Sequence, residues 1–128
     1  KMIAGIEHIA VCSKDTAALK DWYIKVFGMK QVYDNGKGTY FVAAADGSMI
    51  EIIKETSSFE KTEMFAGGIR HFALSVTADE FDPMVEKIKA AGAETLTEPT
   101  EKNGIRTYFF RDPDGNIFHL IYRPNPLV

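Results

Sequence analysis

The sequence predicts an α+β fold in which two tandem βαβββ modules form a curled mixed sheet around a metal or ligand cavity. An internal duplication carries this prediction. The segment Gly5–Cys12 (GIEHIAVC) is echoed by Gly68–Ser75 (GIRHFALS), and Thr39–Val42 (TYFV) is echoed by Thr107–Phe110 (TYFF). Each copy also contains an amphipathic helix pattern and an Asp-Gly turn, so the chain reads as one supersecondary unit written twice.

At 128 residues the chain is long enough to bury a core, and we expect one domain over residues 1–128. We place module 1 at about 4–54 and module 2 at about 68–123. The linker between them, at about 55–67, lacks clear periodicity. Its apolar side chains could pack as a flap or at an interface: Phe59, Met64 and Phe65.

In module 1, residues 5–12 predict a first strand, residues 29–33 a second, and the segments around Asp46-Gly47 a strand pair with a tight turn. A helix lies between the first two strands. Ser13 or Asp15 can cap its start, and Gly28 ends it. Its apolar stripe has the i, i+3, i+4, i+7, i+8 spacing and consists of Leu19, Trp22, Tyr23, Val26 and Phe27.

Module 2 repeats this order, with strands at about 68–76 and 93–96 and a pair joined at Asp114-Gly115. Asp82 is the expected N-cap of its helix, with Pro83 at the first helical position and Gly92 after the last turn. The buried stripe of this helix consists of Phe81, Met84, Val85 and Ile88.

Composition excludes several classes of function. A net charge of −3 gives no basic surface for nucleic acid, and no apolar run has the length of a membrane helix. The first residues lack the apolar stretch of a signal peptide, and a lone cysteine cannot form an internal disulfide. We therefore expect a cytoplasmic protein with a small-molecule substrate, and Cys12 as a small buried side chain.

The three histidines of the chain fall at matched positions of the duplication. His8 and His71 occupy the same place in the repeated first strand. His119 follows Asp114-Gly115 at the place where Glu51 follows Asp46-Gly47. His8, Glu51, His71 and His119 are therefore four equivalent slots, all filled by side chains that can bind a metal.

Strand alternation predicts that these four side chains share one side of the sheet. His8 alternates with Ile9 and Val11, and His71 with Phe72 and Leu74, so the larger apolar residues should pack under the helices. A curled sheet would then bring the four ligands to one cavity. Imidazole and carboxylate together suit a borderline divalent metal, with Zn or Ni expected first and Fe, Co or Mn as alternatives.

These residues make the chain similar to the vicinal oxygen chelate superfamily, which groups glyoxalases, bleomycin-resistance proteins and dioxygenases. The matching segments cover nearly the whole chain: Gly5–Val11, Trp22–Met29, Gly68–Leu74 and Phe110–Asn116. The resemblance to glyoxalase I implies His8, Glu51 and His71 as metal ligands. At the fourth slot that enzyme has a glutamate that also moves the substrate proton, whereas this chain has His119.

The resemblance implies a metal-dependent lyase or isomerase acting on a small oxygenated substrate, such as a 2-oxoaldehyde–thiol adduct, through an enediolate. Glu51 or His119 is the candidate base. One imidazole nitrogen cannot both bind a metal and accept a proton, so either Glu51 is the base, or His119 leaves the metal, or the chemistry differs. We expect Tyr40, Tyr108 and Arg106 as side chains that could face the substrate.

Other members of the superfamily suggest alternatives: a metal-dependent epimerase, a ring-cleaving dioxygenase, or a non-catalytic ligand-binding protein of the bleomycin-resistance type. Fosfomycin-modifying metal transferases also belong here, and His119 departs from their pattern as well. The resemblance further implies a homodimer, with the cavity formed either within one chain or across two.

Overall fold

The computed structural model describes residues 3–57 and 67–128. It divides into two compact units, Lys1–Phe59 and Glu60–Val128, and each is described here by itself. The division falls inside the predicted linker. Phe59, Met64 and Phe65, for which we expected a flap or an interface, lie outside the described residues.

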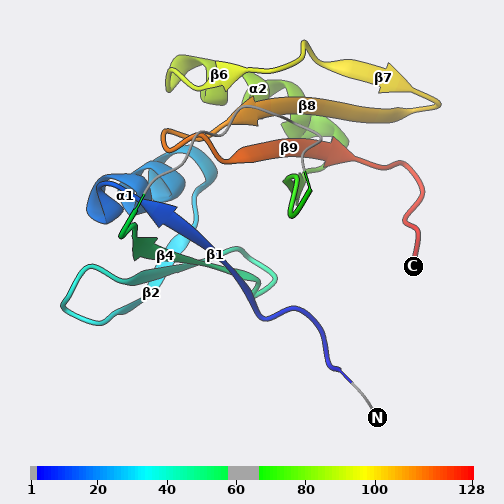
Figure 1. Cartoon of the computed structure of the whole chain (residues 1–128). Coiled ribbons are helices and arrows are strands. Elements are labelled where there is room, and N and C mark those ends of the chain that lie inside the picture. Colours follow the sequence, from blue (N-terminus) through cyan, green and yellow to red (C-terminus); the bar gives the residue numbers. More distant parts are fainter. Residues whose placement is uncertain (1–2, 58–66) are drawn as a thin grey trace. The chain divides into compact units, whose positions relative to one another are not determined.

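The first unit contains β1 (His8–Ser13), α1 (Thr16–Phe27), β2 (Lys30–Asp34), β3 (Tyr40–Ala43) and β4 (Met49–Lys54). Its strands form a four-stranded mixed sheet in the order β1-β4-β3-β2, with β1 parallel to β4 and the other pairs antiparallel (Figure 1). Helix α1 packs on the sheet through β3 and β4. This is the predicted βαβββ order.

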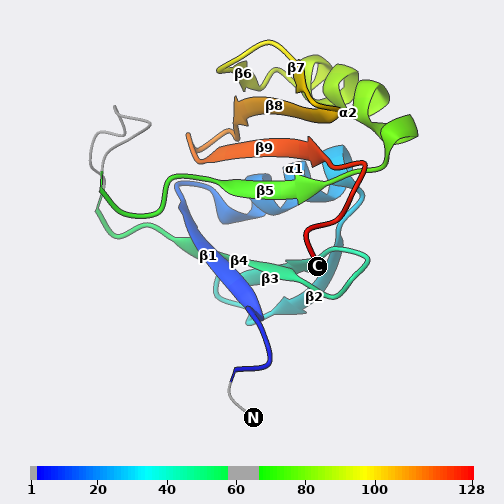
Figure 2. The ribbon, with the colours of Figure 1, turned by 90° about the vertical axis from the view of Figure 1, so that its right-hand side faces the viewer.

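The second unit contains β5 (Phe72–Ser75), α2 (Ala78–Ala90), β6 (Glu94–Thr95), β7 (Thr100–Lys102), β8 (Ile105–Arg111) and β9 (Ile117–Tyr122). The sheet order β5-β9-β8-β6 repeats that of the first unit, with β5 parallel to β9, and the neighbouring strands can be followed in Figure 2. The α+β class and the two mixed modules are therefore confirmed. Neither helix of the described ranges combines the length and apolarity needed to span a bilayer.

Strand β7 is an addition to the predicted order. It pairs with β8 through a tight turn in which Asn103 and Gly104 both have positive φ, 53° and 81°. Asn-Gly is the preferred sequence for such a hairpin turn. All three residues of β7 are exposed, so the strand has no apolar alternation, and the turn was its only signal in the sequence.

The helix caps follow local hydrogen bonding. Asp15 caps α1 by accepting from the backbone N–H of Ala18 at 3.0 Å. The predicted start of α2 at Asp82 is wrong. Thr77 is its N-cap, and Glu80 completes a capping box with it, which places Pro83 inside the helix. The capping box satisfies two helix-terminal groups at once, and this earlier start also brings Phe81 fully into the core.

Each sheet buries the face that meets its own helix. In the first unit this face carries Val11, Val42, Ile50 and Ile52, and in the second it carries Tyr108, Phe110, Phe118 and Leu120. Alternation leaves the neighbouring residues on the other face. Cys12 is one of these and is exposed, so the expectation that it is buried is wrong: it shares the side of His8 and Ala10, away from α1.

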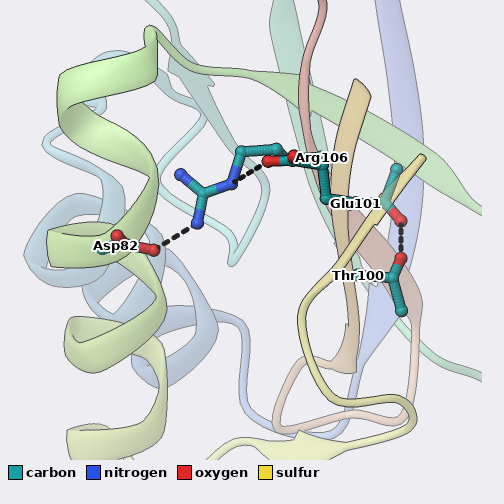
Figure 3. A network of polar contacts seen from close by, with 5 residues as sticks. Asp82, Thr100, Glu101 and Arg106 are labelled. Carbon is teal, nitrogen blue, oxygen red and sulfur yellow. Dashed lines mark hydrogen bonds and ion pairs between the residues drawn. The ribbon is translucent and has the colours of Figure 1, made fainter. Parts of the chain in front are cut away.

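Arg106 links α2 to its sheet. The Nη2 of Arg106 on β8 donates to Asp82 of α2 at 2.6 Å (Figure 3). The guanidinium of Arg106 lies 4.3 Å from the ring centre of Phe81. Its Nε lies 3.6 Å from Glu101 of β7. These contacts put the side chain of Arg106 on the helix-covered face of the sheet.

We expect Phe81→Ala to lower the free energy of unfolding by about 3–5 kcal/mol, because it removes a fully buried ring and leaves a cavity under α2. Urea denaturation monitored by circular dichroism measures the change. Leu127→Ala is the matched control, since that side chain is 77% exposed and its loss should cost less than about 0.5 kcal/mol. Equal effects of the two variants would contradict the described core.

Candidate metal centre

In the first unit, His8 and Glu51 are brought together by the parallel pairing of β1 and β4. Ala10 lies beside Glu51 in this pairing, and His8 precedes Ala10 by two residues on the same face. The small alanine side chain leaves room between them. As a result, Nε2 of His8 lies 3.5 Å from Oε1 of Glu51. Phe41 of β3 lies opposite Glu51 and packs its ring edge-on to His8, with centroids 5.2 Å apart.

The tautomer of His8 follows from its contact with Glu7. Nδ1 of His8 lies 2.7 Å from Oε1 of Glu7. Because a carboxylate only accepts, Nδ1 carries the proton and donates it to Glu7. In the neutral ring the lone pair is then on Nε2, the atom that faces Glu51. A histidine ligand is commonly oriented by this kind of carboxylate contact.

The second unit repeats the register with His71 and His119. Ala73 of β5 lies beside His119 of β9, and Phe109 of β8 lies opposite it. The two imidazoles meet edge to face at a centroid distance of 4.6 Å. Phe109 stacks on His119 at 4.3 Å with an interplanar angle of 4°, and it also contacts His71 at 5.3 Å. This packing fixes the plane of the His119 ring.

His119 is a buried imidazole with unmet hydrogen-bonding capacity. It is 7% exposed, and its Nδ1 has no hydrogen-bond partner among the described residues. Burial, together with the positive charge that His71 has once it is protonated in acid, lowers the pKa of His119 to about 4. The ring is therefore neutral at neutral pH, with lone-pair chemistry that a cation can use.

His71 is also held neutral. Its pKa is lowered by burial and by the charge of Arg70. Nη1 of Arg70 donates to Nδ1 of His71 at 3.2 Å, and the guanidinium lies 5.3 Å from the ring centre of Phe109.

The chemistry of the two pairs fits a divalent metal. Ligand atoms bound to one Zn²⁺ at about 2.0–2.2 Å lie roughly 3–4 Å apart, which is close to the 3.5 Å between His8 and Glu51. The described residues of either unit bring together two such side chains and not three. Each unit thus supplies one half of the predicted set, and the complete site of four ligands stays a prediction.

The expected substrate-facing residues are on the wrong face. Tyr108 is fully buried and hydrogen-bonds Oγ1 of Thr95 at 2.6 Å. Arg106 binds α2, as described above. The ring of Tyr40 lies 4.9 Å from the Nζ of Lys20 on α1. All three belong to the helix-covered face of their sheets, so those expectations are wrong.

Phe41 and Phe109 are the residues that sequence reasoning missed. They follow Tyr40 and Tyr108 directly, and alternation therefore puts them on the opposite face, beside the ligand pairs. The signal was present in the repeated Thr-Tyr-Phe motif, whose phenylalanine has the same phase as Glu51 and His119.

The fold and the paired ligand-type residues are those of a glyoxalase-like protein. The chain belongs to the Glyoxalase/Bleomycin resistance protein/Dioxygenase superfamily, whose family model matches residues 5–120. This confirms the resemblance inferred from the repeated motifs.

Individual relatives point to two kinds of protein. The chain is 28% identical over 125 residues to the fosfomycin resistance protein FosX of Listeria innocua, covering 93% of this chain and 90% of FosX. It is 27% identical over 128 residues to lactoylglutathione lyase GLX1 of Arabidopsis thaliana, covering 93% of this chain but only 44% of that relative.

Solved structures agree with these relatives. A point mutant of FosX of Listeria monocytogenes complexed with Mn(II) and 1S,2S-dihydroxypropylphosphonic acid matches with a TM-score of 0.76 and 28% identity, over 93% of this chain and 90% of that one. A glyoxalase/dioxygenase from Nostoc punctiforme matches with a TM-score of 0.82 at 18% identity, over 95% and 92% of the two chains, and shows the fold alone.

The low pKa of His119 predicts a loss of stability in acid. Between pH 6.5 and about 4 the unfolded chain binds a proton at this residue that the folded chain does not. The free energy of unfolding therefore decreases as the pH falls through this window. For the metal-free protein in EDTA we expect a loss of about 3 kcal/mol from this residue. His119→Leu should flatten the slope, as measured by urea denaturation at several pH values. An unchanged slope would contradict the described environment of His119.

Proposed function

We propose that His8, Glu51, His71 and His119 bind one divalent metal, and that the chain is a metal-dependent enzyme acting on a small oxygenated substrate. The observation that carries this proposal is the matched register of the two pairs. Duplication has put two ligand-type residues at the same place in each sheet, and the pair in the second unit includes a buried imidazole without a hydrogen-bond partner among the described residues. A bound cation would satisfy that nitrogen.

The metal would act as a Lewis acid on a substrate that presents two neighbouring oxygen atoms. Zn or Ni remains the first expectation for a set of imidazoles and a carboxylate. The presence of Mn(II) in a FosX complex supports Mn as an alternative. Comparing affinities for these ions is therefore part of any test.

Glu51 is the residue that we propose as the base. An imidazole nitrogen that binds a metal cannot also accept a proton, whereas a carboxylate has two oxygen atoms and can bind through one and accept a proton at the other. His119 is also closed in by Phe109, whereas the side chain of Glu51 is 24% exposed. His119 is thus better suited to bind the metal, and Glu51 to exchange protons with a substrate.

The first candidate reaction is that of a glyoxalase-type lyase on a 2-oxoaldehyde–thiol adduct. In this reaction Glu51 would take a proton from the carbon beside the carbonyl and return it to the neighbouring carbon. The match to lactoylglutathione lyase GLX1 supports this candidate. The chain spans less than half of the length of GLX1, so the activity of the whole relative is only a proposal for this chain.

The second candidate is opening of the epoxide ring of a small phosphonate of the fosfomycin type by water or a thiol. Glu51 would take the proton of the nucleophile as it bonds to an epoxide carbon, the C–O bond of that carbon would break, and the released oxygen would be protonated to a hydroxyl. The FosX matches support it, since they cover nearly all of both chains, and one includes a bound dihydroxypropylphosphonic acid. The same four ligands would serve either reaction, so assays must compare the two substrates directly.

Single ligand substitutions test the metal site. We expect His8→Ala or His71→Ala to weaken Mn²⁺, Ni²⁺ or Zn²⁺ binding by more than about 100-fold, since even outer partners of a ligand typically contribute 10–100-fold. Isothermal titration calorimetry measures this, and elemental analysis gives the metal found in the purified protein. The exposed Cys12→Ala serves as the control on the same face. Binding that survives the double substitution of His8 and His71 would overturn the proposal.

Glu51→Gln tests the base. The glutamine amide has the shape of the carboxylate and keeps an oxygen atom that can bind a metal, but it cannot accept the substrate proton. We therefore expect turnover to fall by about 10²–10⁴-fold. Activity is followed with methylglyoxal and glutathione, and separately with fosfomycin, at saturating metal. A variant that binds metal but keeps full activity would rule out Glu51 as the base. Absence of turnover of both substrates by the native protein would overturn both candidate reactions.

A further inference from the structure

The residues directly before the two repeated histidines carry opposite charges. Glu7 precedes His8 and accepts a hydrogen bond from its Nδ1 at 2.7 Å. Arg70 precedes His71 and donates to its Nδ1 at 3.2 Å. The duplicated modules therefore orient their equivalent imidazoles with opposite partners.

This difference decides which nitrogen can bind a cation. In the neutral ring of His8 the proton is on Nδ1, so the lone pair of Nε2 is available to a metal. A guanidinium has only donors, so Nδ1 of His71 must accept and its proton is on Nε2. While Arg70 holds His71, one ring nitrogen is occupied by the arginine and the other carries a proton. His71 can act as a ligand only if Arg70 leaves Nδ1.

Once Arg70 has left His71, its positive charge must be offset by another group near the metal. The guanidinium stays ionised under all ordinary conditions, and its charge acts on both His71 and His119. It is partly buried and lies 5.3 Å from the ring centre of Phe109 on the ligand side of the sheet. A divalent cation bound by the same two imidazoles would repel it strongly in this environment. An anion placed between the two positive groups would offset that repulsion.

We propose that Arg70 binds an oxyanion group of the substrate, a carboxylate or a phosphonate, next to the metal, and that metal and anion bind cooperatively. This inference rests on the proposed function, because it requires His71 as a ligand. It narrows the substrate class to small acids that carry the oxyanion close to the oxygens held by the metal. The planar guanidinium can hold either group through two hydrogen bonds. Arg70 is then a specificity residue, and Glu7 serves only to orient His8.

Calorimetric titration of Mn²⁺ tests the cooperativity in the native protein, in Arg70→Met and in Arg123→Met. Arg123 is a matched control, since it is exposed, belongs to the same unit and also acts electrostatically on His119. We expect methylphosphonate, or acetate if the substrate is a carboxylate, to tighten Mn²⁺ binding by about 10-fold in the native protein and in Arg123→Met. Arg70→Met should show no such gain, and without the anion it should bind Mn²⁺ at least as tightly as the native protein.

A second readout follows the imidazole itself. Long-range ¹H–¹⁵N NMR of the metal-free protein should show the proton of His71 on Nε2, and adding Zn²⁺ should remove it from that position or move it to Nδ1. In Arg70→Met the Nε2 preference should be lost before any metal is added. A proton on Nδ1 of His71 in the metal-free native protein would overturn the inference about Arg70 but not the proposed function. So would a gain in Mn²⁺ affinity with methylphosphonate or acetate that is as large in Arg70→Met as in the native protein. Failure of the native protein to bind any metal would instead overturn the proposed function.

Discussion

In both units, the strand that carries a ligand-type residue is held in place by the apolar residues on either side of it. Glu51 stands between Ile50 and Ile52, and His119 between Phe118 and Leu120, all four of which are buried. Because successive side chains point to opposite faces, burial of these neighbours under a helix forces Glu51 and His119 to the other face. A shift of register by one residue would bury the carboxylate and expose the core, so the hydrophobic effect fixes the positions of Glu51 and His119.

The parallel pairing of the first and last strands of each module adds the second ligand-type residue. It sets an alanine beside Glu51 or His119, and the histidine two residues earlier then reaches across the space left by the methyl group. Phe41 and Phe109 close the opposite side of each pair. The two modules thus share one strand pairing around the paired residues. The chemical differences between them arise from single residues at equivalent positions of that pairing.

The exchange of glutamate for histidine at the fourth slot is the first of these differences. A second carboxylate there would add negative charge, whereas His119 is neutral, buried and stacked on Phe109. This favours a division in which the imidazole binds and Glu51 moves protons. The exchange of Glu7 for Arg70 is the second difference, because it places a permanent positive charge beside one ligand pair and not beside the other. Together they leave the first unit richer in negative charge at its pair and the second richer in positive charge.

Much of this architecture was determined by the sequence alone. The repeated Gly-Ile-X-His motif and the two Asp-Gly turns predicted the modules, and alternation predicted the shared face of each pair, because hydrophobic periodicity and turn chemistry are local properties. The start of α2 at Thr77 was also a local property, because the Thr77–Glu80 capping box is written in the sequence, although the Asp82-Pro83 pair obscured it. Two things were decided only by tertiary structure. Arg106 and Tyr108 turned out to serve the core, since their partners Asp82 and Thr95 are distant in the sequence. The contact of Arg70 with His71 depends on the conformation of the arginine side chain. That conformation follows from packing against Phe109, which is distant in the sequence, so no local pattern encodes it.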